Sequence, residues 1–329
     1  MSELDNQLNQ ARAAEAAGNF FSAAFLYKDA LSLARNAGQS AIIKICKNKI
    51  PEMNKQVKND LNKFSIECKV SEESINKVIK HFLDKGDAAS ILKAIGIEPV
   101  LFPKYQEIVK SAQTTMPIGF NIANLSTISD EDHLIKGGDD GMKFCEMTLY
   151  ERSQTIILRA YLTGLFYEIA EKNIINKKVF SDYLKNTGFF TNWPFEIIEI
   201  GIERYFTGDF VSALHILIPQ FEGLFLYLSG KLSLDVVALN RGQGISTQTT
   251  TLSLVFLSTE ECKKVWGEDL CEQLKFILFE PLGYELRHKM AHGRIRVSEC
   301  NFGTVSLVLY LYLVLSARVK TIKFNNVIK

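Results

Sequence analysis

Cationic and titratable side chains gather in one short stretch near the C-terminal end of the chain, residues 285–296, with the sequence ELRHKMAHGRIR. They are Arg287, His288, Lys289, His292, Arg294 and Arg296. The planar guanidinium of Arg287 suits a phosphate group, and the imidazole of His292 titrates near neutral pH. RNA brings its own nucleophile, the 2′-hydroxyl, so such a pair needs no metal and no protein nucleophile to act on a phosphodiester. These residue types therefore favour phosphoryl chemistry on RNA.

A metal site is the competing interpretation of the two histidines. His288 and His292 are four residues apart, so on a helix they share one face and could chelate an ion. The metalloprotease pattern, however, needs Glu directly after the first His, and Lys289 stands there with a charge that opposes a cation. No acid-rich stretch nearby supplies a third ligand. We therefore expect neither a metal nor another cofactor.

The spacing of Arg287 and His292 sets a geometric condition. Five residues along a straight helix correspond to about 140° around its axis, so both side chains cannot point at one atom. Two arrangements resolve this. Gly293 ends the helix and lets His292 turn, or a symmetric dimer brings two motifs together so that Arg and His act across the interface.

Lys289, Arg294 and Arg296 flank this pair. They could contact neighbouring phosphates and make RNA binding dependent on salt, or they could be ordinary surface charges. The sequence leaves both interpretations open.

The bulk composition limits the possible partners. The chain has 329 residues, and 38 Lys plus Arg stand against 37 Asp plus Glu, a formal charge of +1. This net charge is too small to attract a polyanion to the protein as a whole, so any RNA contact must come from a local basic patch. The six cysteines form no C-x-x-C pair and the first ten residues are polar, which favours reduced thiols and a cytoplasmic protein. Residues 304–317 are strongly apolar but too short for a membrane span of about 20 residues, so we expect a buried helix and no membrane contact.

Helical signals dominate the chain. Apolar residues with a period of 3.6 predict a helix that Asp209 caps and Gly230 stops, and a capping-box spacing at Ser258 predicts a second helix to about Phe279. The stretches GNFFSAA at 18, GDAASIL at 86 and GDFVSAL at 208 share Gly followed by Asn or Asp, which is typical of tight connections between helices. We expect an all-α protein.

Three parts are expected along the chain. Residues 1–118 form an N-terminal helical domain, whose start resembles a tetratricopeptide (TPR-like) hairpin although an ordinary amphipathic pair fits as well. Residues 119–146 form a linker or long loop, rich in Pro, Gly, Asn and Ser. Residues 147–329 form a C-terminal helical domain. A second irregular segment, residues 240–251, interrupts its helices.

The sequence RHKMAH fits the R-x4-H signature of the HEPN superfamily, and RHKMAHG resembles the R-N-x-x-x-H-G signature of one family of unknown function within it. The upstream segment GDFVSALHILIPQFEGLF is similar to that family's preceding helix. The resemblance covers roughly residues 205–318. It implies an antiparallel helical bundle, as in the many metal-independent ribonucleases of this superfamily.

The resemblance also implies residue roles. Arg287 becomes the phosphate-binding cation and His292 the acid or base. Glu222 lies on an apolar helix face, and a partly buried carboxylate needs a cationic partner. It either orients Arg287 or His292 or closes a structural salt bridge. This chain departs from the family in two places. His288 replaces a polar residue that is most often Asn, and Phe225 replaces an Arg.

Two functions follow as expectations. The first is a cytoplasmic RNA endonuclease with a composite Arg/His site at the interface of a homodimer, of a type that often acts in defence or toxin systems. The second is a non-catalytic HEPN-like module that dimerises and binds protein or nucleic acid, with the N-terminal helices as a scaffold for a protein partner.

Overall fold

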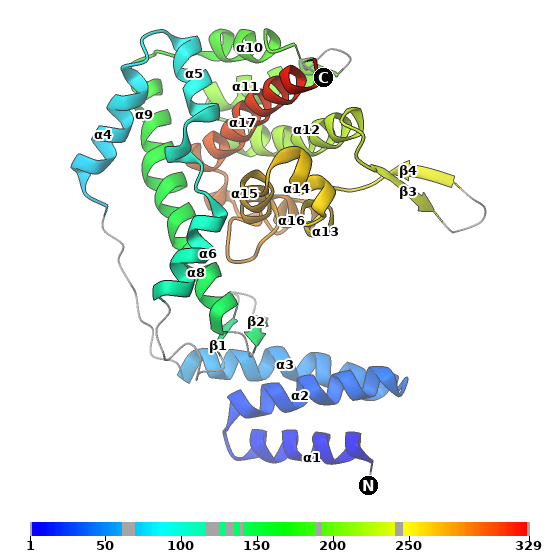
Figure 1. The fold of residues 1–329 in the computed structure, drawn as a ribbon. Helices are drawn as coiled ribbons and strands as arrows, with labels where there is room; N and C mark the ends of the chain where they lie inside the picture. The colour runs from blue at the N-terminus through cyan, green and yellow to red at the C-terminus, as the bar shows by residue number, and fades with distance from the viewer. Residues whose placement is uncertain are drawn as a thin grey trace. The chain divides into compact units, whose positions relative to one another are not determined.

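The structure is a computed structural model, which describes residues 2–60, 70–115, 125–128, 134–138, 141–188, 193–240 and 246–327. Most of them are helical, and the described strands are short, so the all-α prediction is confirmed (Figure 1). The chain divides into two compact units, each with its own core. Met1–Cys68 and Thr115–Cys145 form the first unit, and Lys69–Thr114 and Glu146–Lys329 form the second.

The first unit is built from three consecutive helices, α1 (Glu3–Ala16), α2 (Phe20–Asn36) and α3 (Ser40–Asp60). Small and aromatic side chains on facing stripes bury one another, among them Ala11, Ala30 and Tyr27. The Tyr27 hydroxyl donates to Glu15 at 2.5 Å, and Lys49 closes an ion pair with the same carboxylate at 2.6 Å. The predicted helical hairpin at the start of the chain is therefore present, whereas its kinship with tetratricopeptide repeats stays a prediction.

A short antiparallel hairpin completes the first unit. It pairs β1 (Leu125–Ile128) with β2 (Leu134–Gly138), with a register shift between Thr127 and Ile128. This hairpin falls within the predicted linker 119–146, and most of the remaining residues of that segment lie outside the described part of the chain.

The second unit contains the elements that position the candidate site. Its helices before the site are α4 (Glu72–Leu83), α5 (Ala88–Ile97), η1 (Pro99–Leu101), α6 (Tyr105–Thr115), the later part of α8 (Gly141–Thr155), the π-helix η2 (Ile156–Leu162), α9 (Thr163–Glu171), α10 (Lys177–Lys185), α11 (Phe195–Phe206) and α12 (Phe210–Lys231). Its later elements are β3 (Val237–Asn240), β4 (Ser246–Thr249), α13 (Leu254–Leu257), α14 (Glu260–Trp266), α15 (Glu268–Leu278), α16 (Leu286–Ala291), η3 (Val297–Glu299) and α17 (Phe302–Val327).

The division differs from the predicted boundary at residue 118, because α4, α5 and α6 pack with the C-terminal helices. Gly96 of α5 lies so close to α17 that a Cβ atom there would meet the Leu313 carbonyl oxygen at 2.6 Å. The backbone N–H of Tyr105 donates to Asp269 at 2.8 Å. Residues 69–114 therefore belong to the same core as the candidate site.

All three predicted Gly-Asn or Gly-Asp connections are confirmed. Gly18, Gly86 and Gly208 have positive φ angles of 73°, 93° and 81°. The Asn or Asp that follows each caps the next helix by accepting a hydrogen bond from a backbone N–H three residues on. The predicted start of α12 at Asp209 is thus correct, and the helix ends one residue after Gly230.

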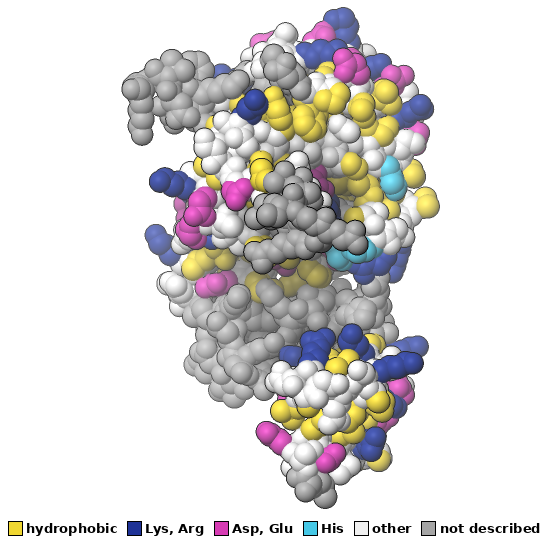
Figure 2. All heavy atoms as spheres, turned by 90° about the vertical axis from the view of Figure 1, so that its right-hand side faces the viewer, with side chains coloured by type: hydrophobic (Ala, Val, Ile, Leu, Met, Phe, Trp, Pro, Cys, Tyr) yellow, Lys and Arg dark blue, Asp and Glu magenta, His cyan; other side chains and the backbone are white. Residues whose placement is uncertain are grey.

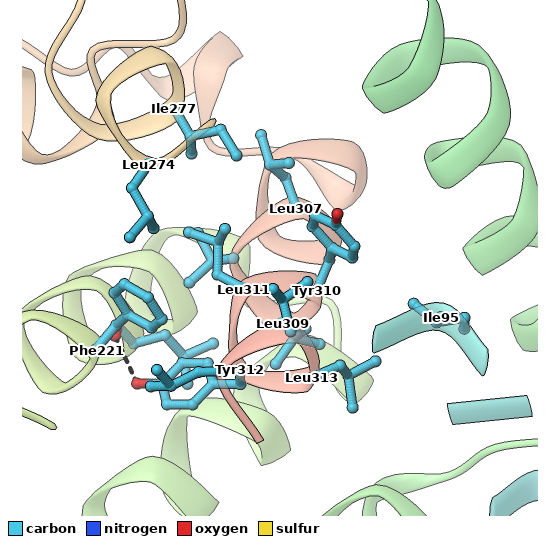
Figure 3. Close-up of a cluster of buried hydrophobic side chains, with 14 of the residues drawn as sticks. Ile95, Phe221, Leu274, Ile277, Leu307, Leu309, Tyr310, Leu311, Tyr312 and Leu313 are labelled. Atoms are coloured by element: carbon cyan, nitrogen blue, oxygen red, sulfur yellow. Dashed lines mark hydrogen bonds between the residues drawn. The ribbon is translucent and has the colours of Figure 1, made fainter. Parts of the chain in front are cut away.

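The core of the second unit surrounds α17, and Figure 3 shows part of it, with Leu307, Tyr310 and Tyr312 of α17 among the labelled side chains. Two tyrosines in its centre find acceptors for their buried hydroxyls. Tyr312 donates to the Leu217 carbonyl and Tyr310 to the Leu101 carbonyl, each at 2.8 Å. The helix expected at residues 304–317 is therefore buried, as predicted.

By length and composition alone, two described helices could cross a membrane, Phe210–Lys231 and the Phe302–Val319 part of α17. In their most apolar windows, 50% and 78% of the residues respectively are buried inside the unit. The apolar side chains of these two helices thus form much of the core of the second unit, as expected for buried helices of a globular domain.

Two predicted elements are wrong. The helix expected from Ser258 to Phe279 is divided at Gly267, where φ is 89°, and Thr259 rather than Ser258 caps its first part. The irregular segment 240–251 contains strand β4, which pairs with β3 from Val237↔Thr249 to Asn240↔Ser246. Gly267 adopts a conformation that few other residues accept, and this breaks the helix in spite of the continuous apolar period.

Candidate active site

The approach to α16 is a tight backbone crossing. Gly283 lies against the end of α15, where a Cβ atom would come within 1.9 Å of the Phe276 carbonyl oxygen. That carbonyl accepts a hydrogen bond from the N–H of Tyr284 at 3.1 Å. Glu285 then takes a left-handed conformation with φ at 53°, rare for a residue with a side chain. These contacts fix where α16 begins.

α16 is short and ends just before the histidine of the motif. Leu286 anchors it in the core, and His292 follows its last residue with φ at −99° and ψ at 7°. Gly293 is left-handed with φ at 64°, and its N–H donates to the Met290 carbonyl. The predicted helix end at Gly293 is confirmed, and His292, whose N–H still donates to the His288 carbonyl at 3.1 Å, is exposed.

Arg287 is held by Glu222 of α12, a residue 65 positions away. The Nε atom of Arg287 donates to Oε2 of Glu222 at 3.0 Å and Nη2 donates to Oε1 at 3.2 Å, a side-on fork of two hydrogen bonds. The N–H of Leu252 also donates to Oε1 at 3.1 Å. The guanidinium carbon lies 5.9 Å from the Phe279 ring centre. Arg287 is thus fixed in direction by Glu222, one of the two pairings predicted for this carboxylate.

This fork leaves part of the guanidinium free. Arginine has five N–H donors, and the pair with Glu222 uses two of them. Within the described residues, no hydrogen bond engages the other three, and the side chain of Arg287 is 25% exposed. An anion can therefore reach Arg287 without breaking the pair.

Phe225 occupies the position where the HEPN resemblance expects an arginine. It is fully buried, and its ring stacks on Trp266 at 4.8 Å between ring centres and on Phe221 at 6.1 Å. The position faces the core and not the site. Position 225 of α12 therefore supplies no cation to the motif.

The two histidines lie side by side, with ring centres 4.4 Å apart. Burial lowers the pKa of His288, a tendency that Glu285 opposes and that His292, Arg294 and Arg287 reinforce. The Nε2 atom of His288 is 3.7 Å from Oε1 of Glu285. Among the described residues, no group of three or more His, Cys, Asp and Glu side chains is placed to hold a metal ion.

The flanking cations differ in how they are held. Lys289 is bound to Glu299 at 2.5 Å, and Arg294 lies 3.5 Å from Glu285. The side chain of Arg296 is exposed and forms no ion pair with any described residue. Figure 2 shows Lys and Arg interspersed with Asp and Glu on the face drawn there. Two of the three side chains predicted to bind RNA, Lys289 and Arg294, therefore lie beside a carboxylate, which reduces the positive charge of the motif.

Sequence reasoning missed two contributors to this site. Glu285 lies between His288 and Arg294 and contacts both, and the N–H of Leu252 helps to hold Glu222. In the sequence, only its position directly before the helix could have identified Glu285. Leu252 contributes a backbone N–H, which every residue except proline has, so its residue type could not have identified it.

Comparison with known proteins found no match to a family model, to a curated protein or to a solved structure. The HEPN resemblance thus rests on the residues of the motif and of the preceding helix.

Proposed function

We propose that this protein is a metal-independent RNA endonuclease of the HEPN type, a cytoplasmic homodimer that acts in a defence or toxin system. Its site combines Arg287 and His292 at the interface of two copies of the C-terminal unit. The observation that carries the proposal is the side-on fork between Glu222 and Arg287. It fixes the direction of the guanidinium and leaves three N–H donors for a phosphate.

The chemistry follows from these two groups. His292 takes the proton of the 2′-hydroxyl, whose oxygen then bonds to the adjacent phosphorus as the bond from phosphorus to the 5′-oxygen breaks. The leaving 5′-oxygen takes a proton from water, and the products carry a 2′,3′-cyclic phosphate and a 5′-hydroxyl. Arg287 stabilises the negative charge that develops on the phosphoryl oxygens. Phosphates on either side of the cleaved one contact Arg296. They also contact Lys289 and Arg294, each of which keeps its carboxylate partner.

The second copy supplies what one copy lacks. His292 follows the last residue of α16 and is exposed, whereas Arg287 points to α12. An isologous contact places the exposed His292 of each copy near the free donors of the other's Arg287.

One observation favours a non-catalytic alternative. Arg287, Lys289 and Arg294 each have a carboxylate neighbour, which is also the pattern of a structural ion-pair network. In that case the unit is a HEPN-like binding and dimerisation module, and the motif stabilises its interface.

Cleavage and assembly distinguish the two. Purified protein is incubated with single-stranded, hairpin and transfer RNA in excess EDTA, beside the Arg287→Ala and His292→Ala variants, and each is analysed by size-exclusion chromatography with light scattering. We expect cleavage by the intact protein and loss of at least 100-fold in both variants, which remain dimeric. Undiminished cleavage by the variants excludes the assigned roles. An intact protein that cuts no RNA, with variants that become monomeric and unstable, establishes the binding module instead.

A further inference from the structure

A cavity of about 440 Å³ adjoins α16 and is lined by residues from four segments of the second unit. The loop before α16 and α16 itself form one segment, the junction of η2 with α9 the second, η3 the third and the start of α17 the fourth. We propose that this cavity binds one nucleotide of a single-stranded RNA. The inference rests on the proposed function for its substrate, and on the residues below for its chemistry.

Arg159 supplies a positive charge to the lining of the cavity. It lies in the π-helix η2, an irregularity that occurs often at functional sites. Its guanidinium carbon is 5.5 Å from the centre of the Tyr284 ring, and its charge partly offsets the rise in pKa that burial causes at Tyr284 and Glu151. The residue is exposed. A guanidinium supported by an aromatic ring can meet a phosphate with its edge or a nucleobase with its plane.

The start of α17 adds donors for an anion. The Asn301 side chain caps this helix by accepting hydrogen bonds from the Thr304 N–H at 3.1 Å and the Thr304 hydroxyl at 3.3 Å. Gly303, in the first turn, also lines the cavity. The partial positive charge of the first turn favours a phosphate near this end of the cavity.

A paired Lys and Glu complete the lining. Lys289 and Glu299 lie 2.5 Å apart, so an ammonium and a carboxylate face the cavity together. Such a pair offers a donor and an acceptor at once, as a ribose hydroxyl requires. Glu299 also cancels the charge of Lys289, which leaves Arg159 as the main attraction for a phosphate.

The dimensions decide the class of ligand. Cavities that bind small molecules usually measure about 300–1,000 Å³, and this one lies in the lower part of that range. One nucleotide matches that size. The volume of the cavity therefore fits a single unpaired nucleotide.

The test measures binding separately from cleavage. Full-length protein with Arg287→Ala and His292→Ala is titrated into a fluorescein-labelled twelve-nucleotide single-stranded RNA, and fluorescence anisotropy gives the Kd. Arg159→Gln is added to this background and compared with Arg152→Gln. Arg152 is an exposed arginine two turns earlier on the same helical run and outside the cavity lining. We expect Arg159→Gln to raise the Kd about tenfold and Arg152→Gln to change it less than twofold, since a stacked base contributes about 1–3 kcal/mol.

Two further arms keep the result interpretable. Arg159→Lys keeps the charge without the plane and is expected to fall between the intact residue and Arg159→Gln. Free adenosine 5′-monophosphate should displace the RNA at lower concentration than inorganic phosphate. Equal Kd values for Arg159→Gln and Arg152→Gln, or no binding of RNA at all, overturn the inference.

Failure of the proposed function looks different. If the intact protein cuts no RNA while Arg159→Gln still weakens binding, the cavity binds a nucleotide but the protein is not a ribonuclease. If RNA is cut and Arg159→Gln binds it normally, the protein is a ribonuclease but the cavity does not bind its substrate.

Discussion

The carboxylate of Glu222 accepts two hydrogen bonds from Arg287, at 3.0 and 3.2 Å, and a third from the backbone of Leu252. Glu222 is 18% exposed and Arg287 25% exposed, so the pair is partly shielded from water. Shielding strengthens the interaction and raises the cost of losing either member alone. This pair joins the middle of α12 to the motif on α16.

Replacing Glu222 by Gln tests this coupling. The amide keeps one acceptor but presents N–H groups that cannot accept from arginine, so the guanidinium loses its fixed direction. We expect RNA cleavage to fall roughly 10- to 100-fold, because a small misplacement of a catalytic group has an effect of that order. The free energy of unfolding should fall by about 1–2 kcal/mol.

The matched control is Glu199→Gln, on the neighbouring helix α11, which breaks the partly exposed ion pair of Glu199 with Lys185 of α10. Its effect on stability should stay below about 1 kcal/mol and cleavage should be normal. Full activity of Glu222→Gln, in a protein whose Arg287→Ala variant is inactive, would show that Glu222 does not position Arg287.

Gly293 permits a second prediction. Its φ of 64° favours glycine, and a Cβ atom there meets nothing within 4 Å, so a substitution acts through the backbone alone. Gly293→Ala should lower the free energy of unfolding by about 1 kcal/mol and reduce cleavage by displacing His292. Gly293→Asn should be milder, because Asn accepts this conformation more readily.

Gly188→Ala serves as its control, since Gly188 has a similar φ of 73° and equally open surroundings in the same unit. Thermal unfolding should report a similar loss for both alanine variants, while cleavage should drop only in Gly293→Ala. An equal drop in cleavage would attribute the effect to general destabilisation.

Phe225 yields a third prediction, on the departure from the HEPN pattern. Phe225→Arg places a charge in the core, inside a stack with Trp266 and Phe221. We expect insoluble or unfolded protein, whereas Phe225→Leu should fold with a loss of roughly 1–2 kcal/mol. Expression yield and circular dichroism measure this. A folded Phe225→Arg protein with increased cleavage would show that α12 can deliver a cation to the site.

Mixed dimers test whether the site is shared between copies. Arg287→Ala and His292→Ala proteins, each inactive alone, are unfolded together, refolded and assayed. If each site takes Arg from one copy and His from the other, a mixed dimer has one complete site, and about a quarter of the normal activity should return. Continued inactivity in mixtures shown by mass spectrometry to contain mixed dimers would place both residues in one copy.

Local signals in the sequence predicted the local structure well. Gly followed by Asn or Asp identified three helix connections, because the backbone at those glycines needs a positive φ and the next side chain caps a helix. Gly293 identified the end of α16 for the same reason. The break at Gly267 was missed because the apolar period continues across it and was given more weight than one glycine.

Contacts between distant segments were harder to predict. The apolar surroundings of Glu222 indicated that it needs a cation, but two candidates remained until α12 and α16 were placed. No local signal related residues 69–114 to the C-terminal helix, although α5 packs against α17 and the Tyr310 hydroxyl donates to the Leu101 carbonyl, 209 residues away. Arg159 carried no signal, because its cavity combines segments that periodicity and capping do not relate.

The central claim is that the 2′-hydroxyl of RNA attacks the adjacent phosphate at this site. The most direct measurement uses an RNA oligonucleotide that the protein cuts, beside the same oligonucleotide with a single 2′-deoxyribose at the cut position, both in excess EDTA, with mass spectrometry of the fragments. We predict 2′,3′-cyclic phosphate and 5′-hydroxyl ends from the RNA and no cleavage at the deoxyribose. Cleavage of both substrates at equal rates, or fragments that carry a 5′-phosphate, would contradict the account.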